Sequence, residues 1–398
     1  MIVTAKLRVM LCLPDLQDLG VQHDVRCLMR YWDREKFEPV MLVHKREGAF
    51  AAQFPDDLRS VEVDSYIPDV PMARVLLRVL GYARAFRDFR PDAVIAFVPY
   101  TNLAAAYARP LSKLKFGLAV SEHAHVSASM RDPEAFNGAF LWYYRRHFSG
   151  IYNARADLVK CIAEESRRDL IENHGIESAR TRLIYNPVDL DEVAHLAREP
   201  VDDPWFSEEE RTKTPVILNV GRLSRQKSQD LLLEAFARVR RTTRARLALV
   251  GRGPHLEGLR RRARELGVTE NVRFVGFQRN PWKYMARSSM LVMSSVWEGL
   301  PCVLTEAMSL RLPIVSTRCP SGPTEMLLEG RGGVLVPVGD VAALESAIVQ
   351  VLEEPDAARD RAEVAHAHVD RFRPEAVTRQ YEALARELVE LQHPRQFN

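Results

Sequence analysis

Short apolar segments alternate along the chain with longer segments whose apolar residues recur every three or four positions. The short segments are near-continuous apolar runs, which is typical of strands buried on both faces of a sheet. The longer segments have the period of helices that pack one side on a core. Strands that alternate with helices in this way predict an α/β fold with parallel sheets.

The same alternation runs through both halves of the chain. The predicted strands cover residues 7–13, 39–43, 61–63, 93–98, 116–120, 158–162, 216–220, 247–250, 272–275, 290–293, 313–316 and 334–336. The predicted helices cover residues 24–32, 73–89, 164–173, 229–241, 254–266, 281–287, 305–310, 324–329, 341–353 and 374–391. Each half therefore has the elements of a doubly wound sheet, in which ligands bind at the carboxyl ends of the strands.

A turn signal at Asn186-Pro187 separates the halves, and a polar stretch over 198–214 follows that we expect to be a loop. We predict an N-terminal domain over 1–187 and a C-terminal domain over 188–398. Both are expected to be Rossmann-like and to face each other across a cleft, where a binding site is sought first.

Composition narrows the class of protein. The 398 residues are 46% hydrophobic, and 56 Lys and Arg face 53 Asp and Glu, which excludes broad disorder and argues against a nucleic-acid partner. The five cysteines are scattered, so neither a disulfide framework nor a zinc motif is expected. The sequence contains no uninterrupted apolar run of about 18 residues, so no membrane-spanning helix is expected. We expect a cytoplasmic protein.

The segment 294–308 carries the most informative polar residues. Glu298 and Gly299 follow a predicted strand, and Glu306 comes eight residues after Glu298, on a helix that begins near Pro301. Gly299 would let the backbone approach a ligand closely. Glu306 could accept two hydrogen bonds from a ribose diol. The alternative is a loop with one solvated and one helical glutamate.

The start of that helix is a candidate phosphate site. The backbone N–H groups of Leu300, Cys302 and Val303 would point out of a helix N-terminus, which favours an anion. Two further strand-end loops fit this chemistry. Arg222 and Lys227 follow Gly221 and could neutralise a diphosphate. Gly251 and Gly253 follow the next strand. Ordinary basic and glycine turns are the alternatives.

Taken together, these segments resemble the retaining glycosyltransferases of the GT-B fold, family four, also called glycosyl transferases group 1. The resemblance covers most of the C-terminal half. It rests on Gly221-Arg-Leu-Ser-Arg-Gln-Lys227, Val250-Gly-Arg-Gly-Pro254, Val272-Arg-Phe-Val-Gly276, Glu298-Gly-Leu-Pro301, Glu306-Ala-Met308, Pro313-Ile-Val315 and Ser321-Gly-Pro-Thr-Glu325.

The resemblance implies a nucleotide-sugar donor, UDP-linked by family preference, held by the second domain. Arg222 and Lys227 would bind the diphosphate in place of a metal, and Glu298 would face the hydroxyls of the transferred sugar. Glu306 would hold the ribose. Backbone at Gly276 and Phe277 would meet the base, and Leu300, Pro301 and Cys302 would place amides on the phosphates. The last helix, about 374–391, would cross back to the first domain.

The first half resembles the family more weakly. The loop 18–24 has only Gly20 where the family often has two glycines, and its backbone is a weaker candidate for a phosphate contact. His123 follows a strand where relatives place a histidine near the anomeric carbon; a structural histidine is the alternative. A metal at His123 and His125 lacks a third ligand. Asp189 in Asp189-Leu-Asp191 is predicted to cap a helix rather than to bind a metal.

The segment 73–90 bears on the acceptor. Leu76, Val79, Leu80, Ala83 and Phe86 form a stripe beside five arginines, so this helix could lie on an anionic membrane surface. Ordinary packing of the stripe on the sheet is the favoured alternative.

These observations lead to one expected function. It is a cytoplasmic or peripheral inner-membrane enzyme that transfers a hexose or N-acetylhexosamine from a UDP-sugar to a glycolipid or polysaccharide, without a cofactor. The alternatives are a nucleotide-sugar epimerase or hydrolase of the same fold, using Glu122 and His123, and a non-catalytic nucleotide-sugar binder.

Overall fold

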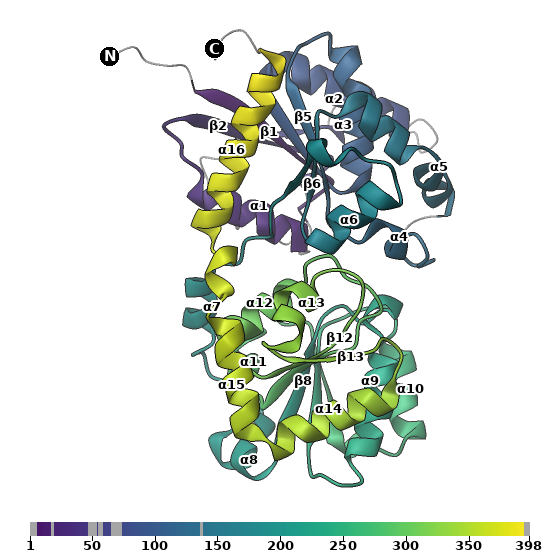
Figure 1. Cartoon of the computed structure of the whole chain (residues 1–398), viewed down its shortest axis with the longest axis vertical. Helices are drawn as coiled ribbons and strands as arrows, with labels where there is room; N and C mark the ends of the chain where they lie inside the picture. The colour runs from purple at the N-terminus through teal and green to yellow at the C-terminus, as the bar shows by residue number, and fades with distance from the viewer. Residues whose placement is uncertain are drawn as a thin grey trace. The chain divides into compact units, whose positions relative to one another are not determined.

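The computed structural model describes residues 6–16, 20–46, 54, 59–64, 74–135 and 138–393. The chain divides into two compact units. The first contains residues up to Pro187 together with those from Pro374 onward, and the second contains Val188–Arg373. Each unit is built around one parallel sheet covered by helices (Figure 1).

The first unit has a seven-stranded sheet in the order β3-β2-β1-β4-β5-β6-β7. Its strands are β1 (Leu7–Leu13), β2 (Phe37–Val43), β3 (Ser60–Glu62), β4 (Ala93–Phe97), β5 (Gly117–Glu122), β6 (Leu158–Cys161) and β7 (Thr181–Leu183). Its helices are α1 (Gly20–Tyr31), α2 (Arg74–Phe89), α3 (Pro99–Ser112), α4 (Val126–Ser129), α5 (Gly138–Arg155), α6 (Glu164–Glu172) and α16 (Pro374–Gln392).

Two apolar cores enclose this sheet. Residues of α2, α3 and α5 pack on one face, and residues of α1 and α16 pack on the other. Gly117 shows how closely α16 lies on β5, because a Cβ at this position would come within 2.4 Å of the Leu388 carbonyl oxygen. The helix at the C-terminal end of the chain is therefore part of the first unit's core.

The second unit has a six-stranded sheet in the order β10-β9-β8-β11-β12-β13. Its strands are β8 (Val216–Val220), β9 (Arg246–Val250), β10 (Val272–Gly276), β11 (Met290–Met293), β12 (Ile314–Thr317) and β13 (Val334–Val336). Its helices are α7 (Leu190–Leu196), α8 (Glu208–Lys213), α9 (Gln229–Val239), α10 (Leu256–Glu265), α11 (Trp282–Met285), α12 (Cys302–Ser309), α13 (Pro323–Met326), α14 (Val341–Glu353) and α15 (Pro355–His366).

The predicted α/β class and the twelve predicted strands are confirmed, each to within two residues at either end. The sequence pattern missed β7, α3, α4, α5 and α15. The prediction of a loop over 198–214 is wrong, because this stretch contains α8. Ser207 caps that helix by accepting a hydrogen bond from the amide of Glu210 at 3.3 Å.

The single stripe predicted on α2 is divided in the structure. Val79, Ala83 and Phe86 are buried in the core, whereas Leu76 and Leu80 are 64% and 48% exposed. Packing on the sheet, the favoured alternative, therefore accounts for the buried part of the stripe. The predicted start at Ala73 lies outside the described residues.

Candidate functional site

The loops after β8 and β11 lie at the switch point of the second sheet. Strand order runs one way from β8 through β9 and the other way from β11 through β12. Loops that leave such adjacent strands in opposite directions form the crevice in which doubly wound sheets bind ligands. Arg222 and Lys227 follow β8, and Glu298 follows β11, so the structure brings these predicted residues to one edge.

An ion pair joins the two loops. The Nζ of Lys227 lies 2.6 Å from Oε1 of Glu298, and their side chains are 19% and 6% exposed. Three more hydrogen bonds reinforce it: Ser294 Oγ to the Lys227 carbonyl at 2.8 Å, Gln226 Nε2 to the Trp297 carbonyl at 3.0 Å, and the Val296 amide to the Gln226 carbonyl at 2.8 Å. This network fixes the position of the Glu298 carboxylate.

The cations of this edge keep capacity for an anion. An ammonium has three donors, and Lys227 uses one of them on Glu298. Arg222 is exposed, and its guanidinium makes no hydrogen bond or ion pair with the described part of the chain. A diphosphate could therefore gain contacts from both residues without breaking the Lys227–Glu298 pair.

The glycine loops after β8, β9 and β10 pack on one another. The Gly221 amide donates to the Val250 carbonyl at 3.0 Å, and the Gly251 amide donates to the Gly276 carbonyl at 2.9 Å. A Cβ on Gly251 would come within 1.9 Å of the Gly221 carbonyl oxygen, and its φ is +146°. Gly251 was predicted to approach a ligand, but this contact between loops already requires a glycine.

The segment predicted to meet the base ends in an exposed ring. Gly276 has a φ of +81° with open space around its Cα, and Phe277 is 41% exposed. The guanidinium of Arg252 lies over the Phe277 ring, 4.6 Å from its centroid. Arg252 was missed by the sequence reasoning, although it lies inside the Gly251–Gly253 motif.

Helix α12 places the remaining predicted donor residues. Pro301 is its N-cap and Cys302 its first residue, while Leu300 before it is buried. Glu306 lies one turn into the helix. Burial raises the pKa of its carboxyl to about 7, and the indole of Trp282 opposes that rise. Gly299 packs closely under Gly322, whose Cβ would come within 2.5 Å of the Gly299 carbonyl oxygen.

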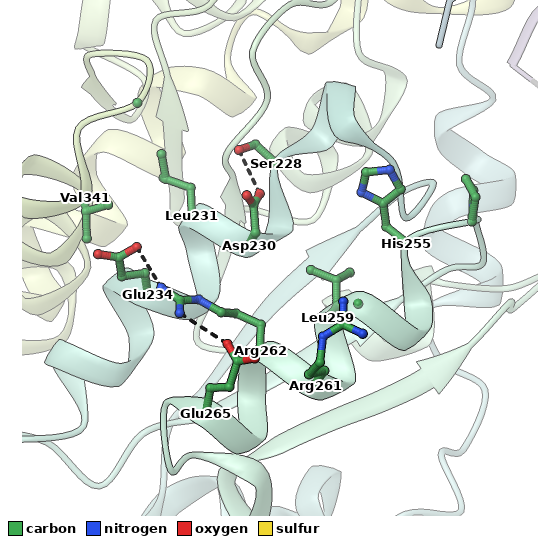
Figure 2. A pocket seen from close by; sticks show the side chains of 13 residues that line it. Ser228, Asp230, Leu231, Glu234, His255, Leu259, Arg261, Arg262, Glu265 and Val341 are labelled. Atoms are coloured by element: carbon green, nitrogen blue, oxygen red, sulfur yellow. Dashed lines mark hydrogen bonds and ion pairs between the residues drawn. The ribbon is translucent and has the colours of Figure 1, made fainter. Parts of the chain in front are cut away.

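A groove of about 910 Å³ lies elsewhere on this unit, between α9 and α10 (Figure 2). Several of the polar side chains drawn there contact one another: Arg262 pairs with Glu234 and Glu265 at 3.3 and 3.4 Å, and Ser228 Oγ hydrogen-bonds Asp230 at 3.1 Å. Its described lining includes none of the predicted site residues. The groove is therefore not the predicted donor site.

In the first unit, His123 follows β5 and lies in a mostly enclosed environment. Its Nε2 is 2.8 Å from Ser121 Oγ, and its Nδ1 is 3.7 Å from Oδ2 of Asp24 on α1. Burial, and next the charge of Lys160, lower the pKa of His123 well below its usual value. Burial raises the pKa of Asp24 to about 7, with Lys160 opposing. The imidazole is thus neutral, and its surroundings are polar.

Asp24 and Lys160 were missed because they are far from His123 in sequence. Lys160 is fully buried on β6, and its Nζ lies 5.2 Å from the centroid of the Tyr381 ring on α16. Neither carboxylate oxygen of Asp24 makes a hydrogen bond within the described residues. Three elements therefore bring buried polar groups together around His123.

Glu122 has a structural setting. It is 2% exposed, and its carboxylate accepts hydrogen bonds from Asn102 Nδ2 at 3.0 Å, from Tyr144 Oη at 2.9 Å and from Tyr152 Oη. Burial raises the pKa of Glu122, and these hydrogen bonds oppose the rise. The idea that Glu122 acts as an acid or base of an epimerase is not supported, because its carboxylate is enclosed.

Two other predictions concern single residues. Asp189 caps α7 by accepting from the Glu192 amide at 3.0 Å, which confirms the prediction of an N-cap. Gly20 begins α1, and a Cβ there would meet no atom within 4 Å. Asp18, in the same predicted loop, lies outside the described residues.

The structure adds two facts about metals and membranes. In the ranges given above, no group of three or more His, Cys, Asp or Glu side chains is arranged to hold a metal ion. None of the described helices combines the length and the hydropathy needed to cross a bilayer.

Comparison with known families follows the same division of the chain. The profile described as Glycosyltransferase Family 4 matches residues 20–192, and the profile described as Glycosyl transferases group 1 matches residues 202–368. The protein belongs to the family-four glycosyltransferases of the GT-B fold.

Individual relatives agree with this family. An uncharacterised glycosyltransferase of Methanocaldococcus jannaschii is 29% identical over 266 residues, which are 64% of this chain and 62% of that protein. The chain thus spans less than two thirds of that relative. A second relative is 26% identical over 295 residues, which are 72% of this chain and 74% of that protein. It is the N-acetylgalactosamine-N,N'-diacetylbacillosaminyl-diphospho-undecaprenol 4-alpha-N-acetylgalactosaminyltransferase of Campylobacter jejuni.

A solved structure supports the fold. Anabaena HepE in complex with UDP and glucose superposes with a TM-score of 0.77 over 96% of this chain and 100% of its own, at 20% identity. At that identity the likeness concerns the arrangement of elements alone.

Proposed function

We propose that the protein is a retaining glycosyltransferase that transfers a hexose or N-acetylhexosamine from a UDP-sugar to a glycolipid or polysaccharide acceptor in cell-surface glycan biosynthesis. The observation that carries this proposal is the Lys227–Glu298 pair, which holds a carboxylate and a loop cation at the switch point of the second sheet, with Arg222 in the same loop as Lys227. Family membership supports the reaction class.

The relatives support the choice of substrates. The Campylobacter protein is named for an acceptor linked to diphospho-undecaprenol, which is a lipid. The Anabaena structure contains UDP and glucose. A lipid-linked acceptor and a UDP donor are therefore the substrates we propose for this chain.

Each donor-site residue has a proposed role. Arg222 and the two remaining donors of Lys227 bind the diphosphate. The backbone at Leu300, Pro301 and Cys302 forms the N-terminal end of α12 beside it, where Leu300 and Cys302 supply N–H groups and Pro301 has none. The two loop cations supply the charge that a metal would otherwise provide, so no metal cofactor is proposed.

Three positions bind the rest of the donor. Glu298 accepts hydrogen bonds from hydroxyls of the transferred sugar, and Glu306 accepts them from the ribose. The exposed segment at Gly276 and Phe277 meets the base. Gly251 contributes by letting the neighbouring loops pack closely.

The proposed step is a front-side displacement. The bond between the anomeric carbon and the phosphate oxygen breaks, and a bond to the acceptor oxygen forms on the same face. The acceptor proton passes to the departing phosphate oxygen, and the electron pair of the broken bond leaves with the phosphate. The neutral His123 orients the sugar in this step rather than removing the proton.

The exposed leucines of α2 support a peripheral membrane location. Leu76 and Leu80 lie on the solvent side of a helix that also exposes Arg84 and Arg87. Apolar and basic side chains together favour an anionic lipid surface, such as the inner face of a membrane.

The proposal is tested by turnover. Purified protein is incubated with radiolabelled UDP-glucose, UDP-galactose and their N-acetylamino counterparts, together with undecaprenyl-diphosphate-linked saccharides, and label in the lipid phase is counted. Glu298→Ala should reduce transfer by about 100-fold or more while the protein still folds, as judged by one cooperative thermal unfolding transition. Near-native turnover of this variant contradicts the role of Glu298.

The same assay separates the alternatives. Release of free sugar or of an epimer from the donor without acceptor identifies a hydrolase or an epimerase. Binding of UDP without transfer to any acceptor identifies a non-catalytic binder.

A further inference from the structure

Two aromatic side chains lie at the carboxyl edge of the first unit's sheet. Tyr100, the second residue of α3, follows the end of β4 by three positions and is 44% exposed. Its ring stacks on the half-buried ring of Phe140 on α5, with centroids 3.8 Å apart and planes inclined at 23°. The stack covers one face of the Tyr100 ring and leaves much of the residue in contact with solvent.

This aromatic pair lies beside the switch point of the first sheet. Strand order reverses between β1 and β4, which is where sheets of this kind bind ligands. Phe97, the last residue of β4, is paired with Ser121 of β5. The chain segments that lead to Tyr100 and to His123 therefore leave the sheet from neighbouring strands.

The connection from β4 to α3 is strained. Val98 has a φ of 68° and a ψ of 156°, an outlying conformation for a β-branched residue. Its carbonyl accepts hydrogen bonds from the Asn102 amide at 3.0 Å and from Thr101 Oγ1 at 3.1 Å. Strain of this kind persists only where the surroundings hold it, and it is concentrated at functional sites.

A buried column of rings supports the pair. Phe140, Tyr144, Phe148 and Tyr152 recur every four residues along α5, and successive centroids lie 5.7, 4.7 and 5.5 Å apart.

The far end of that column is fixed to α3. Tyr144 and Tyr152 donate to Glu122, which also accepts from Asn102. The enclosed carboxylate thus ties α3 to α5, which pack side by side in this unit (Figure 1). A surface that is rigid before binding loses little conformational entropy when a ligand arrives.

We propose that Tyr100 and Phe140 form a stacking platform for a pyranose ring of the acceptor glycan. One face of a pyranose presents apolar C–H groups, and these pack against the electron-rich face of an aromatic ring. The platform deepens the proposed function by giving the acceptor a subsite in the first unit, and it rests on that function for the word acceptor.

Saturation-transfer NMR tests the platform directly. The probes are the methyl pyranosides of glucose, galactose, N-acetylglucosamine and N-acetylgalactosamine, in the presence of saturating UDP to occupy the nucleotide site. We expect transfer to the ring C–H protons of at least one probe with the wild-type protein. Transfer should be lost in Tyr100→Ala and retained in Tyr100→Trp.

A matched control comes from the same helix as Phe140. Trp142 is 68% exposed on α5 and lies outside the Tyr100–Phe140 stack, so Trp142→Ala should keep the signal. Persistence of transfer in Tyr100→Ala, its loss in Trp142→Ala, or no transfer from any probe to the wild-type protein overturns the proposal.

Two further measurements distinguish pyranose stacking from donor binding and from lipid contact. Calorimetric titration with UDP reports on the donor site alone. UDP binding without pyranoside contact refutes the platform and leaves the proposed function standing. Pyranoside contact without UDP binding refutes the proposed donor and leaves a sugar-binding platform. Co-sedimentation with anionic phospholipid vesicles should be equal for wild type and Tyr100→Ala. A drop in the variant would show that these rings contact lipid, and the proposal would be wrong.

Discussion

Replacing Glu306 by glutamine probes both the electrostatics and the ligand role of this carboxylate. Glu306 lies in α12 where burial raises its pKa to about 7, against an ordinary value of 4.5. Glutamine keeps the size and the acceptor oxygen and removes the titration. The variant therefore separates the charge of the residue from its shape.

The sign of the stability effect follows from the direction of this shift. The folded protein binds the Glu306 proton more tightly than the unfolded chain does, so wild-type stability falls as pH rises from about 4.5 through 7. The full difference in pKa corresponds to at most about 3 kcal/mol, reached above pH 7. Glu306→Gln should thus be more stable than wild type near pH 8 and closely similar near pH 4.

Ligand affinity should change in the opposite sense. A carboxylate that accepts from the ribose hydroxyls contributes about 1.5–3 kcal/mol, so Glu306→Gln should weaken UDP binding by about tenfold or more near pH 8. Near pH 5 the wild-type carboxyl is itself protonated, and the two affinities should converge.

Thermal unfolding and calorimetric UDP titration, each across this pH range, measure both effects. A ratio of UDP affinities that stays constant with pH refutes the role of a titrating Glu306 at the ribose. A stability difference that does not grow with pH refutes the raised pKa.

Three more predictions concern other contacts. Lys227→Ala leaves the buried Glu298 without its cation and should lower the free energy of unfolding by about 3 kcal/mol, measured in urea. Adding Glu298→Gln to this variant should recover much of the loss. If the stability changes of the two single variants simply add in the double variant, the pair is not coupled. Gly251→Ala should lower stability by about 2 kcal/mol or more because its Cβ would strike the neighbouring loop, whereas Gly258→Ala, in open space on α10, should be neutral or stabilising; equal melting temperatures would contradict this. Leu80→Ser should weaken co-sedimentation with anionic vesicles at low salt without changing unfolding, and unchanged binding would remove α2 from the membrane contact.

Most strands could be predicted because they are near-continuous apolar runs in sheets covered on both faces, whereas the missed strand β7 is only Thr-Arg-Leu. The helices that escaped prediction have local reasons. Helix α3 contains Pro110, which ordinarily marks a helix end, and α5 has aromatic and basic residues on all sides, which hides its apolar period. Helix α8 is polar throughout, and only its cap at Ser207 signals it.

The donor edge was accessible to sequence reasoning because parallel strands end at the same edge. Lys227 and Glu298 could therefore be expected near each other once their strands were recognised. The environment of His123 was not accessible, because Asp24, Lys160 and Tyr381 come from three other elements. Glu122 was misjudged for the same reason: nothing next to it in the sequence indicates that two tyrosines and an asparagine enclose it.

The central claim is that the second unit binds the nucleotide-sugar of a transfer reaction. Its most direct test is a thermal-shift panel of UDP-, GDP- and ADP-sugars on the wild-type protein and on Arg222→Ala, since a ligand that binds only the folded state raises the melting temperature with its occupancy. We expect UDP-sugars to raise the melting temperature of the wild-type protein, and we expect this shift to be largely lost in Arg222→Ala. No shift with any nucleotide-sugar, or an equal shift in the variant, would contradict it.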